Sequence, residues 1–161
     1  SSRNEEAIEP WSYLQSTVSS ISMLVVGQTI LFTLTEELGW RDYLYSRWRV
    51  YGFLYYSLAI GLIWGIWHWP MIWLFGLNYP ENRLLGLIIF PCFTVLISIF
   101  VTLMRDRGQS VWAAGIFHGT WNAVGGPGGY AVFFIMLVGA IAIIKSETHQ
   151  LSLLKQRNSN R

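Results

Sequence analysis

The sequence predicts an all-α membrane protein, a polytopic bundle of transmembrane helices. Hydrophobic residues make up 53% of the 161 residues and charged residues only 12%, roughly half the charged fraction of a typical soluble domain. The apolar residues gather into five stretches, two of which reach the roughly 20 residues needed to cross the hydrocarbon core of a bilayer. Nine tryptophans and eight tyrosines, many near the ends of these stretches, suit the headgroup region. We therefore expect about five spans.

The first stretch, Val18–Leu34, contains no charged residue. Residues 1–17 before it are a polar flank, either a surface helix or a loop, to which we assign no function. The chain begins with serine rather than methionine, which indicates a piece of a longer protein. After the first stretch apolar residues continue at helical spacing to Arg49, so we expect one long helix from Val18 to Arg49 and a turn near Gly52.

The second stretch, Phe53–Phe75, is predicted to return antiparallel to the first and to end its helix at His68-Trp69-Pro70. Glu36 lies sixteen residues before Gly52 and His68 sixteen after it, so both lie about 24 Å from the turn. This symmetry predicts that the two side chains meet at one depth. Trp64 stands four residues before His68 on the same helical face and should border the same site.

The third stretch, Leu84–Met104, contains Pro91, which is expected to kink the helix, and Cys92, interpreted as a small buried residue. The fourth, Val111–Val124, carries His118 and Asn122 on one face. The fifth, Tyr130–Ile144, closes the bundle. Residues 18–145 would thus form the membrane domain, and residues 146–161 a polar tail suited to the cytoplasmic surface.

Lysine and arginine residues are divided unequally between the two sides that five spans would create. Nine fall on one side and two on the other, so the positive-inside rule places the amino terminus outside and the carboxyl terminus in the cytoplasm. We expect an integral protein of the cell (plasma) membrane. The net charge of +2 is too small to indicate a nucleic-acid partner. The nine are Arg41, Arg47, Arg49, Arg105, Arg107, Lys145, Lys155, Arg157 and Arg161, and the two are Arg3 and Arg83.

Two adjacent carboxylates, Glu36 and Glu37, follow the first apolar stretch directly. Ionisable groups at membrane depth are expensive to desolvate and usually mark a functional site. On a helix Glu37 can pair with Arg41 four residues later, whereas Glu36 points roughly 100° away and needs another partner. The segments around Trp64 to His68 and His118 to Asn122 supply candidates.

These polar groups, on three apolar segments, suit hydrolysis of an amide by activated water. A carboxylate beside a histidine can take a proton from water, and a second histidine with a carboxamide can donate hydrogen bonds to an oxyanion. Glu36, His68 and His118 could instead hold a zinc ion, although the sequence requires no metal and contains no His-Glu-x-x-His motif. Each group also has a structural interpretation, with Glu37–Arg41 as an ion pair, His68 as a capping residue and Asn122 as an interhelical contact.

Three motifs together carry a resemblance to a known family. Glu36-Glu37-x-x-x-Arg41, then Trp64-x-x-x-His68, then His118-x-x-x-Asn122 resemble the motifs of the CAAX-protease and bacteriocin-processing family, also called Abi. The similarity covers about Val18 to Ile144. This sequence has Trp64 where the family usually has phenylalanine, and Asp42 where many members have glycine.

The resemblance implies an intramembrane endopeptidase similar to the type II CAAX prenyl endopeptidases. By analogy, Glu36 and His68 would activate water, His118 and Asn122 would stabilise the oxyanion, and Glu37 and Arg41 would shape the site. The substrate would be a peptide or lipidated protein in the bilayer, prenylated or not. Two alternatives remain open: maturation of a small peptide such as a bacteriocin leader, or self-immunity, and a non-enzymatic membrane scaffold that keeps the motifs as interhelical contacts.

Overall fold

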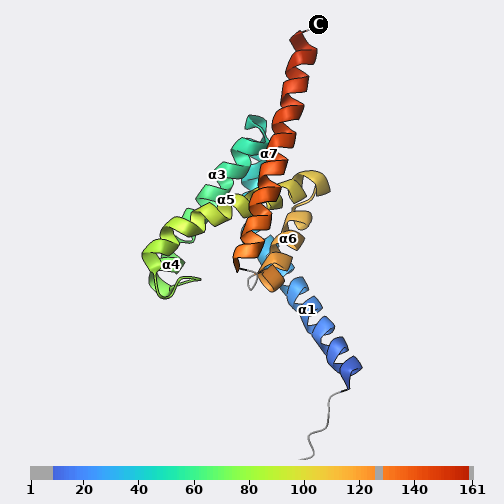
Figure 1. Cartoon of the computed structure of the whole chain (residues 1–161), viewed down its shortest axis with the longest axis vertical. Coiled ribbons are helices and arrows are strands. Elements are labelled where there is room, and N and C mark those ends of the chain that lie inside the picture. The colour runs from blue at the N-terminus through green and yellow to red at the C-terminus, as the bar shows by residue number, and fades with distance from the viewer. Residues whose placement is uncertain (1–8, 126–128, 160–161) are drawn as a thin grey trace, which may run out of the picture.

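The computed structural model describes residues 9–125 and 129–159 (Figure 1), and within these ranges the chain is helical almost throughout and has no strand. The all-α prediction is confirmed. The helices in chain order are α1 (Pro10–Phe32), the π-helix η1 (Thr33–Leu44), α2 (Tyr45–Trp48), the 3₁₀ turn η2 (Arg49–Tyr51), α3 (Phe53–Trp67), α4 (Trp69–Phe75), α5 (Arg83–Gly108), α6 (Val111–Thr120), the π-helix η3 (Trp121–Gly125) and α7 (Gly129–Ser159).

The first four of these helices join into one continuous element from Pro10 to Tyr51, 42 residues long. This confirms the predicted long helix and extends it into the polar flank, where Pro10 occupies the first turn, the position at which a missing N–H costs nothing. The element ends at Gly52, whose φ of 95° is accessible to glycine without strain. Figure 1 shows the amino-terminal half of α1 and the carboxyl-terminal half of α7 extending away from the packed centre.

In the described part of the chain, three helical segments are long and apolar enough to cross a membrane: Pro10–Tyr51, Phe53–Phe75 and Arg83–Gly108. They contain the first three predicted stretches. The fourth stretch is helical too, but its helices α6 and η3 together have only 15 residues. The fifth lies within α7 and falls partly outside the residues whose side chains the structure describes.

Helices α3 and α5 pack along each other through two glycines one turn apart, Gly61 and Gly65. A Cβ atom built on Gly61 would lie 2.6 Å from the Cα of Val95, and one on Gly65 would lie 2.5 Å from the Cα of Pro91. The two backbones are therefore as close as glycine permits. This is the small-xxx-small packing of membrane helices, and it brings Trp64, between the two glycines, into the core.

A second pair of glycines, Gly115 and Gly119, lets α6 approach the first long helix. Gly115 faces the side chain of Thr33, and a Cβ on Gly119 would lie 2.6 Å from the Cα of Thr29. The two threonines repeat the four-residue spacing of the glycines. His118 lies between Gly115 and Gly119, so this close contact places its ring against η1.

Pro91 leaves a carbonyl without its helical partner, because proline has no N–H to donate to Leu87, four residues earlier. The indole Nε1 of Trp69 donates to that carbonyl oxygen at 2.9 Å and so ties α4 to α5. Helix α5 continues through Pro91. Cys92 is exposed, and the prediction that it is buried was wrong. Pro91 faces Gly65, so the next residue along the helix points about 100° away from that contact.

At the carboxyl-terminal end of α5, polar side chains fasten that helix to its neighbours. Arg105 donates from Nε to the backbone oxygen of Arg41 at 2.8 Å, which links α5 to η1. The hydroxyls of Tyr45 and Tyr56 both donate to the carboxylate of Asp106. The position of Arg41 is therefore fixed through its backbone as well as its side chain.

Candidate active site

The π-helix η1 buries four polar side chains, Thr33, Glu36, Glu37 and Arg41. Glu37 and Arg41 have no solvent exposure at all. Buried charges are tolerated only when they are paired and hydrogen-bonded, so each must find partners on the surrounding helices. A π-helix is rare and occurs frequently at functional sites, so the backbone conformation alone makes this segment a candidate functional site.

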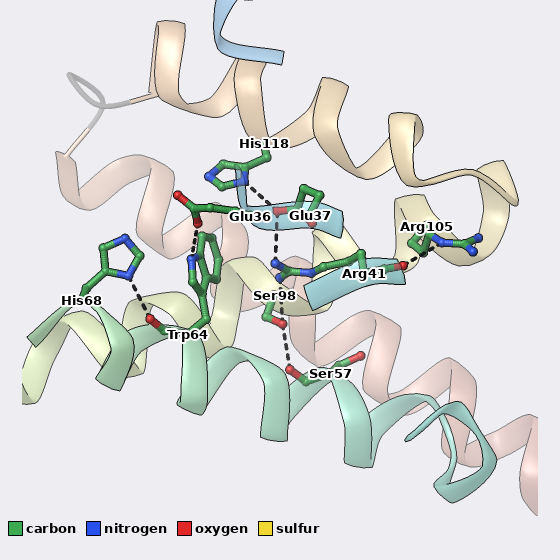
Figure 2. A network of polar contacts seen from close by, with 9 residues as sticks. All are labelled: Glu36, Glu37, Arg41, Ser57, Trp64, His68, Ser98, Arg105 and His118. Carbon is green, nitrogen blue, oxygen red and sulfur yellow. Dashed lines mark hydrogen bonds and ion pairs between the residues drawn. The ribbon is translucent and has the colours of Figure 1, made fainter. Parts of the chain in front are cut away.

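Glu37 is held by two donors through the same oxygen. Arg41 donates from Nη1 to Oε1 at 3.2 Å, which confirms the predicted ion pair. The Nδ1 atom of His118 lies 2.7 Å from Oε1 and comes from α6 (Figure 2). Glu37 thus connects the first and last of the three motifs.

Arg41 also reaches α5, a contact that the sequence analysis missed. Its Nη2 donates to the hydroxyl of Ser98 at 3.1 Å, and Ser98 in turn donates to the backbone oxygen of Ser57 at 2.8 Å. The spacing of Thr94, Ser98 and Thr102, all buried, gives α5 a hydroxyl-bearing face in an otherwise apolar helix. That four-residue repeat was the available signal.

Glu36 finds its partner on α3. The indole Nε1 of Trp64 donates to Oε2 of Glu36 at 2.6 Å, and Glu36 as a residue is only 7% exposed. The sequence analysis expected a partner from the Trp64 to His68 segment and placed Trp64 at the border of the site, but it did not predict a hydrogen bond from the indole. The hydrogen bond is therefore a new feature of the site.

His68 lies at the break between α3 and α4 and is half-buried. Its Nδ1 is 2.8 Å from the backbone oxygen of Trp64, and its ring packs against Phe90 and Trp67 with centroids 4.9 and 5.0 Å apart. A carbonyl oxygen only accepts, so Nδ1 carries the proton and Nε2 keeps its lone pair when the ring is neutral.

Glu36 and His68 share Trp64, which binds one through its indole and the other through its backbone. No direct hydrogen bond joins the two side chains in the described part of the chain. Figure 2 shows the Glu36 carboxylate and the free nitrogens of His68 and His118 turned toward the same space. A contact through one water molecule stays a prediction.

His118 is 3% exposed and is oriented from two sides. Its ring stacks on Phe32 with centroids 4.6 Å apart and meets the edge of Trp64 at 5.0 Å. Because Nδ1 donates to the Glu37 carboxylate, Nε2 is the atom left for a substrate.

Asn122 lies one turn beyond His118, in η3. Its side chain is exposed and makes no hydrogen bond within the part of the chain that the structure describes. The structure therefore leaves Asn122 outside the buried network, where its carboxamide is available to another molecule.

The residues suggested as alternative zinc ligands, Glu36, His68 and His118, are held by other contacts in this structure. Among residues 9–125 and 129–159, no three histidine, cysteine, aspartate or glutamate side chains come together in a group that could hold a metal ion. Glu36 and the Nδ1 atoms of both histidines are engaged by protein groups instead.

A buried network of acidic, basic and imidazole groups inside a bundle of apolar helices defines a membrane protein with an enclosed polar site. The sequence matches the family described as Type II CAAX prenyl endopeptidase Rce1-like over residues 18–124, which is more than half of the chain. The chain belongs to this family of membrane endopeptidases. Neither the curated proteins nor the solved structures contain a match.

Proposed function

We propose that this protein is an intramembrane endopeptidase that hydrolyses a peptide bond in a membrane-associated peptide or lipidated protein, using water activated by Glu36 and His68. The strongest support is that two adjacent buried carboxylates have hydrogen-bond partners of different charge. Glu37 is hydrogen-bonded to Arg41 and His118, whereas the one hydrogen-bond donor to Glu36 among the described residues is the neutral indole N–H of Trp64. The Arg41 charge also acts on Glu36, but no hydrogen bond or ion pair joins the two among the described residues. Oε1 of Glu36 therefore keeps its lone pairs available to take a proton from water.

His68 assists Glu36 in this proposal. Its Nε2 lone pair, fixed by the Nδ1 hydrogen bond to the Trp64 carbonyl, can accept a hydrogen bond from the attacking water and so orient it. Glu36 takes the proton from that water, and the resulting hydroxide attacks the scissile carbonyl carbon. The proton then passes to the leaving amine as the peptide C–N bond breaks.

His118 and Asn122 stabilise the tetrahedral oxyanion. His118 donates from Nε2 when its ring is protonated, and the Glu37 carboxylate at Nδ1 balances that positive charge. Asn122 contributes a carboxamide N–H from the exposed side of η3. Arg41 holds Glu37 in place from the opposite side.

Turnover by the purified protein tests the proposal. Matched prenylated and unprenylated peptides would be incubated with the wild type and with Glu36→Gln, before and after treatment with a chelator. Cleavage by the wild type and its loss in Glu36→Gln, with the fold intact, are the expected results. Preference for one peptide would separate CAAX-type processing from maturation of an unmodified peptide.

Two results would contradict parts of this assignment. Wild-type protein that binds the peptides but cleaves neither would favour a scaffold. Activity that disappears on chelation and returns with zinc would assign the chemistry to a metal and leave Glu36 and the histidines as candidate ligands.

A further inference from the structure

Trp64 packs in the core and also contacts several members of the candidate site. It is 4% exposed and lies in the apolar core between α3 and α5. Its indole N–H donates to Glu36, and the Arg41 guanidinium carbon lies 4.8 Å from its ring centroid. The same ring meets the edges of His68 and His118 at 5.9 and 5.0 Å.

The Glu36 carboxylate depends on this one donor for its orientation. Within the described residues, the Trp64 N–H is its only hydrogen-bond donor, whereas Glu37 has two. The bond uses Oε2 and leaves Oε1 for water. Without it, no hydrogen bond from the described residues would fix the rotamer of the Glu36 side chain.

The chemistry of the donor suits a base. A lysine or arginine at this position would pair with the carboxylate and weaken it as a base. The indole N–H is neutral, donates one hydrogen bond and accepts none, so it fixes the position of Glu36 without taking part in the proton transfer. The ring face also holds the Arg41 guanidinium by a cation–π contact, next to Glu37.

We propose that Trp64 is a positioning residue that holds Glu36 in its reactive rotamer through the indole N–H. This inference rests on the proposed function, in which Glu36 is the base. It assigns to one nitrogen atom of this chain a role that phenylalanine, the usual residue of the family at this position, cannot fill.

Trp64→Phe removes the N–H and keeps an aromatic ring, so it tests the inference directly. Loss of a hydrogen bond to a charged group, with the misplacement that follows, should lower kcat about 10- to 100-fold. KM should stay unchanged, because Trp64 orients the base and not the substrate. Trp40→Phe is the matched control. Trp40 is half-buried and its ring centroid lies 6.1 Å from that of Trp67, but its indole donates no hydrogen bond in the described part of the chain. That variant should keep the wild-type kcat.

A second variant covers the case in which Trp64→Phe does not fold. Replacing Trp64 by benzothienylalanine keeps the bicyclic shape and puts sulfur in place of the N–H. It should reproduce the fall in kcat in protein that still unfolds cooperatively on heating. Wild-type kcat in this variant, or a change confined to KM, would overturn the inference.

Glu36→Gln separates failure of this inference from failure of the proposed function. If Glu36→Gln is inactive while both Trp64 variants turn over like the wild type, Glu36 is the base and Trp64 only packs. If Glu36→Gln itself retains full turnover, Glu36 is not the base, and the role proposed for Trp64 is wrong as well.

Discussion

Glu36 and Glu37 are neighbours in the chain but bind to different helices. Glu37 shares Oε1 between Arg41 and His118, and both Glu37 and Arg41 are fully buried. Glu36 accepts a hydrogen bond only from Trp64 among the described residues. We therefore expect the two carboxylates to have different tasks, structural for Glu37 and chemical for Glu36.

Replacing each glutamate by glutamine should separate these tasks. Glu36→Gln keeps the size and the hydrogen bond from Trp64 but removes the basicity, so turnover should fall by ~10²–10⁴ while stability changes little. Steady-state turnover and thermal unfolding in detergent measure the two effects. Glu36→Gln with near-normal turnover would contradict the assignment.

Glu37→Gln should act mainly on stability. It leaves the Arg41 charge buried without its counter-charge, a change that costs on the order of 3–5 kcal/mol. Some turnover should remain in the folded fraction, because Glu36 is intact. Complete loss of turnover in a fully stable Glu37→Gln protein would reverse the roles of the two carboxylates.

Single residues were predictable where their partners lie close in the sequence. The Glu37–Arg41 pair follows from four-residue spacing on one helix. The bond from Trp64 to Glu36 and the bond from Arg41 to Ser98 join different helices. They depend on how the helices are rotated about their axes, and no spacing along the chain contains that information.

At the scale of helices, the approach of α6 to the first long helix sets the position of His118. Gly115→Ala and Gly119→Ala should each disturb it, because the added methyl meets the Thr33 side chain or the Thr29 backbone. We expect a loss of about 1–3 kcal/mol in stability and reduced turnover in each. Thermal unfolding and peptide cleavage would be measured together.

Gly27→Ala is the matched control for these variants. Gly27 lies on α1, and nothing comes within 4 Å of a Cβ built there. Its stability and turnover should equal or slightly exceed those of the wild type, because alanine favours the helix. Similar losses in all three variants would mean that close packing does not explain the α6 glycines.

Trp69 and Pro91 should be coupled if the indole replaces the hydrogen bond that proline removes. Trp69→Phe leaves the Leu87 carbonyl unpaired and should cost about 1–3 kcal/mol. In a Pro91→Ala background the helix regains an N–H for that carbonyl, so the same change should cost much less. A double-mutant cycle on unfolding free energies measures this, and equal costs in both backgrounds would contradict the coupling.

The hairpin of helices was predictable and the π-helix was not. Glycine at the turn and proline after His68 are local signals for a helix end, and the structure places helix ends at both. The π-helical hydrogen bonds of η1 occur in a segment that has no such helix-end signal. They accompany the burial of Glu36, Glu37 and Arg41 against three other helices, which is a property of the assembled bundle.

For the whole molecule, composition alone predicted the class of fold. Sparse charge and long apolar stretches leave helices as the only backbone that satisfies its own hydrogen bonds in lipid without a closed barrel. The number of spans is harder to predict, because α6 with η3 has 15 residues and crosses only with help from its flanks. The helices that contain the first three stretches are long enough to cross a membrane, whereas the helices of the fourth stretch are shorter.

The orientation of the whole chain is the last prediction. The nine-to-two division of lysine and arginine places the Arg105–Gly108 end of α5 and the carboxyl terminus in the cytoplasm, with Asn82 outside. Figure 1 shows α7 carrying the carboxyl terminus away from the side on which α1 begins. Reporters inserted after Gly108 and after Arg161 should both read cytoplasmic, and one at Asn82 external. If Gly108 reads cytoplasmic but Arg161 external, only one of the last two stretches crosses, and the five-span count is wrong. If all three reporters are inverted, the count stands, and the charge distribution does not set the orientation of this protein.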